Sequence, residues 1–165
     1  MNTYLAGMVS GFVATVPMTV AMEMMHRRLP RRERYPLPPR QITMNLARKA
    51  RMQKHLHEEE RLIATLAAHF GYGAAVGALY APLAQKVRWH PVLKGVLFGL
   101  TVWTVSYLGI LPVIRVLPPA TQQPQRRNEL MIASHIIWGV VLALLTERLS
   151  SSQSEGDSPN ESNAE

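Results

Sequence analysis

The chain of 165 residues contains no cysteine, and charge is missing from four long stretches of it. The lack of cysteine excludes disulfide redox chemistry, thiolate nucleophiles and thiolate metal sites. No Asp, Glu, Lys or Arg occurs in residues 1–22, 62–85, 95–114 and 130–146. A buried helix of a soluble protein is usually interrupted by charge every turn or two, so these stretches disfavour a soluble helical fold.

The uncharged stretches predict membrane-spanning helices, because ~20 apolar residues cross the ~30 Å hydrocarbon core. The first stretch lacks a basic n-region and is too long for a signal peptide, so we expect a retained helix. The predicted fold is an all-α four-helix transmembrane bundle within residues 1–149, followed by a disordered acidic tail, 150–165. Its helices are expected at about 4–25, 62–85, 93–114 and 129–148.

The segment between the first two helices, residues 26–61, holds eleven of the 18 Lys and Arg residues. Its proline-rich part, "RRLPRRERYPLPPR", is expected to be extended, and the part that follows, 41–61, to be helical. The basic residues should attract anionic lipid head groups. No stacking or groove-reading module supports nucleic-acid binding. The run "HLHEEE" is interpreted as solvated charge rather than a metal site, because residues i and i+2 point to different sides of a helix.

The distribution of basic residues predicts the orientation. Fourteen lie in the first and third connections, and four lie in the second connection and the tail. By the positive-inside rule, both termini are expected outside the cytoplasm and the long first connection inside it.

Small residues recur four positions apart in every predicted helix. This spacing places them on one helix face, where backbones can approach closely. The sequence therefore predicts four packing faces. They consist of Gly7, Gly11, Gly73, Gly77, Gly95, Gly99, Gly139 and Ala143.

The second and fourth helices are similar in sequence. "AAHFGYGAAVGAL" from Ala67 aligns with "ASHIIWGVVLALL" from Ala133, so that His69 matches His135 and Gly73 matches Gly139. Each preceding helix opens with a glycine pair. The chain is therefore interpreted as two tandem two-helix hairpins, which would be parallel repeats.

Both histidines are followed by small residues at i+4 and i+8, so both should point into the bundle. Counting residues from the helix ends places Glu23, His69, Tyr107 and His135 in the cytoplasmic third. These four residues form the candidate intramembrane polar cluster. Buried ionisable residues in a membrane suggest a function, although neutral histidines that only lock the packing are an equal alternative.

Three short motifs carry a resemblance: "PLPPR" at Pro36–Arg40, "LPP" at Leu117–Pro119 and "SHIIWG" at Ser134–Gly139. With these, residues 20–148 resemble the YagU-like family of small bacterial inner-membrane proteins. That family is a domain of unknown function loosely associated with acid resistance. The resemblance implies a bacterial inner membrane and transfers no catalytic residue.

Three functions stay open at this point. The first is a non-enzymatic envelope protein without cofactor, related to pH or stress through its histidines. The second is a small transporter or proton-linked permeation unit, expected to be homo-oligomeric because four helices leave little room for a pathway. The third is a haem-binding protein with the histidine pair as axial ligands. An enzyme is not expected, since Ser134 and His135 point about 100° apart on a helix.

Overall fold

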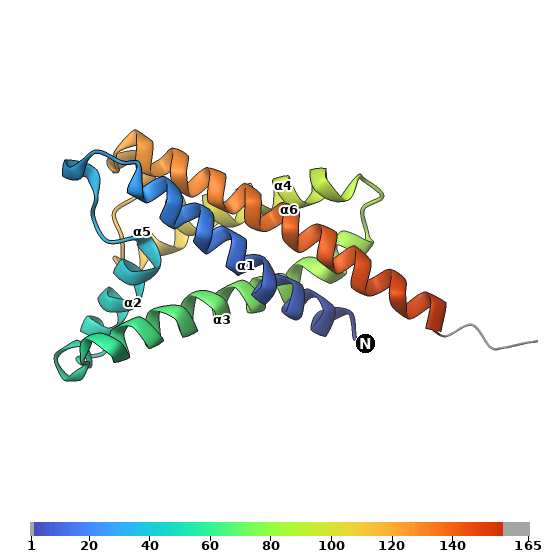
Figure 1. The fold of residues 1–165 in the computed structure, drawn as a ribbon, viewed down its shortest axis with the longest axis horizontal. Helices are drawn as coiled ribbons and strands as arrows, with labels where there is room; N and C mark the ends of the chain where they lie inside the picture. Colours follow the sequence, from blue (N-terminus) through green and yellow to red (C-terminus); the bar gives the residue numbers. More distant parts are fainter. Residues whose placement is uncertain (1, 157–165) are drawn as a thin grey trace, which may run out of the picture.

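The computed structural model describes residues 2–156, and helix makes up 83% of the structure, with no strand in that range. This confirms the predicted all-helical fold class. Four long helices cross the molecule, and a short helix, α2 (Pro38–Lys49), lies at one end (Figure 1). The long helices are α1 (Thr3–Arg27), α3 (Glu58–Gln85), the continuous unit α4–η3–α5 (Pro91–Thr104, Val105–Ile110, Leu111–Val113) and α6 (Gln125–Gly156).

The ends of the long helices are set by local capping and by proline. The backbone N–H of His57 donates to the Glu60 side chain, 2.7 Å away, so α3 begins four residues before the uncharged stretch. The ring nitrogen Nδ1 of His90 accepts from the Val92 N–H and starts α4. The carbonyl of Pro124 accepts from two N–H groups in the first turn of α6. These helices therefore begin before the uncharged stretches that predicted them, and their first turns contain charged residues.

The connection between α1 and α3 differs in part from the extended and helical segments predicted for it. It contains η1 (Arg31–Glu33), and α2 begins at Pro38, since proline is well suited to a first helical turn. The predicted helix 41–61 stops at Lys49, because Arg51 has a positive φ of 59°. A second short turn, η2 (Gln53–His55), leads into α3. The charge run "HLHEEE" thus supplies the N-terminal cap of α3.

The chain is still helical at residue 150, where the tail was expected to begin. Helix α6 continues to Gly156, and the Ser151 hydroxyl donates back to the Glu147 carbonyl, 2.9 Å away. Helical hydrogen bonding thus propagates beyond the apolar span into the polar sequence. Residues 157–165 lie outside the described range.

The long helices pair as two hairpins. Helix α1 packs along α3, and α4 packs along α6, and the two pairs meet mainly where α1 contacts α6. At the first pairing, a Cβ on Gly7 or Gly11 would collide with the carbonyl of Gly77 or Gly73. At the second, a Cβ on Gly95 would collide with the carbonyl of Gly139. Backbones are therefore in direct contact within each hairpin.

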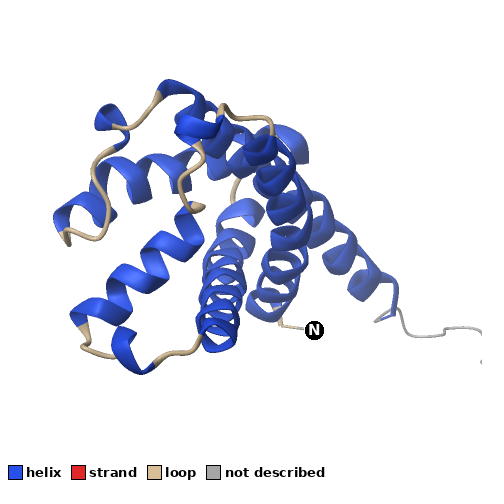
Figure 2. Cartoon of the chain, turned by 60° about the vertical axis from the view of Figure 1, so that its left-hand side comes forward, coloured by secondary structure: helices blue, strands red, loops and turns tan. Residues whose placement is uncertain are grey.

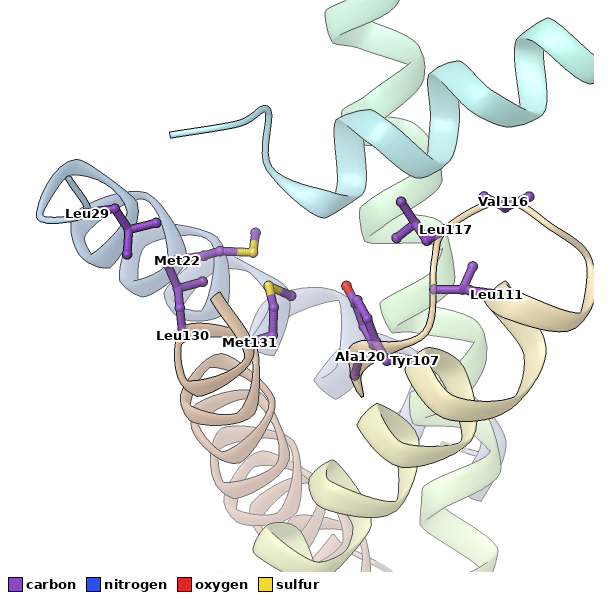
Figure 3. Close-up of a cluster of buried hydrophobic side chains, with 9 residues drawn as sticks. All are labelled: Met22, Leu29, Tyr107, Leu111, Val116, Leu117, Ala120, Leu130 and Met131. Atoms are coloured by element: carbon purple, nitrogen blue, oxygen red, sulfur yellow. The ribbon is translucent and has the colours of Figure 1, made fainter. Parts of the chain in front are cut away.

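Helices α1 and α6 form the centre of the molecule, and two apolar clusters surround their contact. The Trp138 indole donates to the Gly11 carbonyl across this contact, at 3.2 Å. Near α2, Met22 of α1 lies next to Met131 of α6, and Tyr107 reaches toward them from η3 (Figure 3). Pro17 inside α1 has no N–H, so the carbonyl of Val13 lacks its usual helical donor. The hydroxyls of Thr15 and Thr19 donate to the carbonyls of Gly11 and Thr15, so neither pairs with the Val13 carbonyl.

The outer faces of the helices are apolar. Large exposed side chains include Phe12 and Val20 on α1, Leu79 on α3 and Leu97 on α4. A protein dissolved in water rarely exposes apolar surface on this scale. All four long helices are long and apolar enough to cross a membrane, and they suggest a multipass integral membrane protein.

Candidate functional site

A cavity of about 270 Å³ lies between the two hairpins, and we call it the histidine cavity. Helices α1 and α3 form one wall, and η3 and α6 form the other. Helix α2 covers it with Pro39, Ile42, Thr43 and Leu46. Figure 1 shows α1 and α3 diverging toward the end where α2 lies, and Figure 2 shows from another side that helices and loops, not strands, surround this region. The glycine contacts join residues 7–11 of α1 to residues 73–77 of α3, and the cavity lies toward α2, where these two helices have moved apart.

Both histidines of the sequence comparison line this cavity, His69 from α3 and His135 from α6. His135 is 6% exposed, and its Nδ1 atom lies 2.7 Å from the Met131 carbonyl, so this nitrogen carries the proton and donates. The Nε2 atom of His69 is buried and has no hydrogen-bond partner in the described structure. The two rings thus occupy matching places in the hairpins but differ in how their polar atoms are satisfied.

Three further polar groups lie beside the histidines. The hydroxyls of Tyr72 and Ser106 are 3.0 Å apart and join α3 to η3 across the cavity. The ring of Tyr107 meets the ring of His135 edge to face, with centroids 5.8 Å apart. These contacts place a small polar group at the boundary of a mostly apolar space.

Ser106, Tyr107 and Ile110, which line the cavity, all lie in η3, and this segment is a π-helix. The backbone N–H of Leu111 donates to the Ser106 carbonyl five residues earlier. Pro112 has no N–H, and its ring would press on the carbonyl of Leu108, so the ordinary helical register is disfavoured there. Single π-turns inside helices are frequent at functional sites. Proline near the end of an apolar helix was the available sequence signal for this segment.

Of the four residues predicted to cluster, the structure brings together His69, Tyr107 and His135. Glu23 is not part of the group. Its carboxylate pairs with Arg27 one turn later on α1, at 2.9 Å, and its side chain is 45% exposed. Counting residues along α1 did not consider which face of the helix Glu23 occupies.

The opposite half of the molecule is filled. Tyr80 and Phe98 lie 5.0 Å apart by ring centroid, and Phe98 stacks on Trp138 at 6.1 Å. These rings belong to the apolar cluster between the hairpins, on the side away from α2. The histidine cavity therefore ends at Trp138 and occupies only one half of the space between the hairpins.

Tyr72, Ser106, Trp138 and the α2 side chains were not predicted as site residues. The alignment of Tyr72 with Trp138 was the only sequence signal for either of them. The covering of the cavity by α2 could not be predicted from the sequence. Apolar residues such as Ile42 and Leu46 lie along one side of this helix, but such a weak pattern does not show what they cover.

Comparison with known proteins gives one result. Residues 8–144 match the family described as Protein of unknown function (DUF1440). The chain belongs to this family. No curated protein and no solved structure matches the chain. Membership agrees with the expected uncharacterised family, and the likeness to YagU-like proteins stays an expectation.

Proposed function

We propose that this DUF1440 protein is a non-enzymatic membrane protein that binds a small, mainly apolar molecule in the histidine cavity. The bound molecule would carry at least one hydrogen-bond acceptor, such as a carbonyl oxygen. Its site lies between the two hairpins and under α2. In the orientation expected from the basic residues, this is the cytoplasmic half of the bundle.

One observation carries the proposal: the buried Nε2 atom of His69 has no partner although it borders a cavity. A buried polar atom without a partner costs about 1–3 kcal/mol. Proteins rarely retain such a cost without a reason. An acceptor on a bound molecule would satisfy an Nε2–H group and recover part of that cost.

The lining supports the apolar character of the molecule. Ile42, Val102 and Met131 line the cavity, together with the aromatic residues Tyr107 and Trp138. Ligand sites are typically mostly apolar, with a few polar groups that fix orientation. The volume of about 270 Å³ is at the small end of such sites, which favours a one- or two-ring compound over a porphyrin.

The arrangement offers little for catalysis. Ser134, the serine next to His135 in sequence, donates its hydroxyl to the Leu130 carbonyl at 2.8 Å. Ser106 contacts Tyr72 rather than a histidine. A nucleophile needs a base within hydrogen-bond reach, and these serines have other partners. Binding without chemistry is the simpler function for these residues.

A small transporter is the second candidate. Two hairpins with similar glycine contacts enclose one site, as in transporters built from repeats. Movement of one hairpin against the other would then expose the cavity to alternate sides. Proton flux into liposomes that depends on His69 would favour this candidate, and its absence alongside ligand binding would favour the first.

Binding can be tested with two probes of nearly equal shape. 1-Tetralone has a two-ring skeleton with one carbonyl, and tetralin is the same skeleton without it. The thermal midpoint of the purified full-length protein in detergent would be measured by scanning calorimetry with each probe. We expect both probes to stabilise the protein, and the ketone to bind about fivefold to tenfold more tightly, as one net hydrogen bond provides.

Two variants complete the test. His69→Leu removes the donor and should abolish the preference for the ketone while retaining tetralin binding. His55→Leu changes an exposed histidine outside the cavity and should behave as the parent. Stabilisation by neither probe would contradict the proposal, and so would a ketone preference that survives His69→Leu.

A further inference from the structure

A second cavity, of about 480 Å³, lies on the other side of α2 from the histidine cavity. It is built by two connections that are distant in sequence, residues 35–48 and 117–127. Three arginines line it: Arg40 and Arg48 from α2, and Arg127 from the first turn of α6. No Asp or Glu is among its lining residues. We call this space the arginine pocket.

Arg127 is the unusual member of the group, because it is only 5% exposed. Its Nη2 atom donates to the Pro36 carbonyl at 2.9 Å and to the Gln41 side-chain oxygen at 2.8 Å. Its Nη1 atom is buried and has no hydrogen-bond partner in the described structure. In residues 2–156, no carboxylate lies within ion-pair distance of this guanidinium.

A buried positive charge with no counter-ion is unfavourable, since its lost hydration is not repaid by an opposite charge. The two neutral acceptors on Nη2 compensate only part of this loss. An anion in the arginine pocket would supply the missing charge at short range. The burial of Arg127 therefore points to a bound anion.

The other two arginines are held in place by neighbouring side chains. Arg40 donates to Glu58 at the start of α3. Arg48 donates to Asn45 and Gln53. Asn45 in turn donates to the Val116 carbonyl at 2.7 Å, which ties α2 to the connection after α5. Guanidinium groups fixed in this way are arranged in advance for an anion and lose little entropy on binding it.

The position of the pocket indicates which anion is most suitable. It lies next to the chain ends of the apolar helices, beside Leu117 and Pro118, where lipid head groups meet water in a membrane. Guanidinium groups bind phosphate through paired hydrogen bonds. Basic pockets at the ends of membrane helices are suited to anionic head groups.

We propose that the arginine pocket binds the phosphate group of an anionic phospholipid, with Arg40, Arg48 and Arg127 as its ligands. The phosphate neutralises Arg127, and the acyl chains lie along the apolar outer faces of the helices. Because α2 separates this pocket from the histidine cavity, the lipid also fixes α2 in its covering position. The proposal for this site does not depend on which molecule the histidine cavity binds.

The test uses the full-length protein in detergent and native mass spectrometry, which counts bound lipids. Phosphatidylglycerol is compared with phosphatidylcholine of the same acyl chains, and inorganic phosphate is added alone in a third arm. The pocket variant is Arg40→Gln/Arg48→Gln. The control is Arg31→Gln/Arg32→Gln, which removes the same charge from exposed positions in the same connection.

We expect phosphatidylglycerol to bind in preference to phosphatidylcholine, and the pocket variant to bind it at least about tenfold more weakly. The control should bind it as the parent does. Equal losses in the two double variants would mean diffuse attraction to a basic surface and would overturn the proposal. Unchanged binding in the pocket variant would also overturn it. If the protein retains inorganic phosphate as well as it retains phosphatidylglycerol, the ligand is a free anion and the lipid assignment is wrong.

Arg127→Gln is the most direct substitution, but the side chain also joins α6 to Pro36 and Gln41. It is therefore assayed with Gln41→Ala, which removes one of the same structural contacts and leaves the charge. Weaker lipid binding in Arg127→Gln alone supports the proposal. Equal weakening in both variants assigns Arg127 to structure and contradicts its role as a ligand.

Discussion

At the scale of single residues, the two histidines have different surroundings in spite of their matching positions. His135 is fixed by the Met131 carbonyl and the Tyr107 ring, whereas His69 has a buried ring nitrogen with no partner. The contacts of His135 are those expected of a residue that only stabilises helix packing. The unpartnered nitrogen of His69 costs free energy unless a bound molecule supplies an acceptor, and it is the reason to assign ligand binding to His69 rather than to His135.

This difference predicts opposite effects of the same substitution. His69→Leu removes an unsatisfied polar atom and should raise the stability of the unliganded protein by roughly 1 kcal/mol. His135→Leu breaks a hydrogen bond and should lower it by about the same amount. Thermal unfolding in detergent, followed by circular dichroism, measures both. A larger loss for His69→Leu than for His135→Leu would show that His69 is a packing residue.

At the scale of helices, the glycines differ in what surrounds them. Gly77 of α3 is in backbone contact with α1, and a Cβ there would collide with the Gly7 carbonyl. Gly71, nearly two turns earlier on the same helix, has nothing within 4 Å of where a Cβ would be. Close backbone contact within each hairpin explains how helices with apolar outer faces associate in lipid, where burial of apolar surface gives no drive.

Substitution by alanine should affect stability differently at these two glycines. Gly77→Ala should lose about 1–3 kcal/mol, because the backbones must move apart. Gly71→Ala should be neutral or gain up to about 1 kcal/mol from better helix propensity. The yield of monodisperse protein extracted from membranes, together with its thermal midpoint, reports the effect. Similar losses for both would mean that α3 does not pack on α1 through this face.

The sequence was informative about the helices and less so about the site. The length of the uncharged stretches was sufficient to predict four spans, because a helix needs only about 20 apolar residues to cross the hydrocarbon core. Residue counting brought His69, Tyr107 and His135 to one level, but Glu23 turned out to face outward with Arg27. The π-turn at Val105–Ile110 and the docking of α2 depend on tertiary contacts, so periodicity could not predict them.

At the scale of the whole molecule, two hairpins joined through α1 and α6 enclose one cavity, and α2 covers it. The connections that form α2 and the arginine pocket lie together at one end. Figure 1 shows the N-terminus at the other end, with the start of α4 and the later turns of α6. Lys94 of α4 and Glu147 of α6 form an ion pair at 2.9 Å. The basic residues are concentrated at the α2 end, which is expected to face the cytoplasm.

This orientation is tested with topology reporters. A reporter fused after Arg148 should be active only outside the cytoplasm, and one inserted after Lys54 only inside it. Alkaline phosphatase and green fluorescent protein fusions give complementary signals for the two sides. The reverse pattern would place the α2 end outside and would contradict a cytoplasmic entrance to the histidine cavity.

The central claim is that the histidine cavity binds a small molecule, and the absence of natural cysteine allows a direct measurement. Ser106→Cys places one thiol in the cavity wall, and Thr101→Cys places one on the exposed face of α4 as a control. The measurement is the rate at which methyl methanethiosulfonate modifies each thiol, with and without 1-tetralone. We predict that the ketone slows modification of Ser106→Cys severalfold and leaves Thr101→Cys unchanged. Equal rates with and without the ketone at Ser106→Cys, or equal slowing at both positions, would contradict the claim.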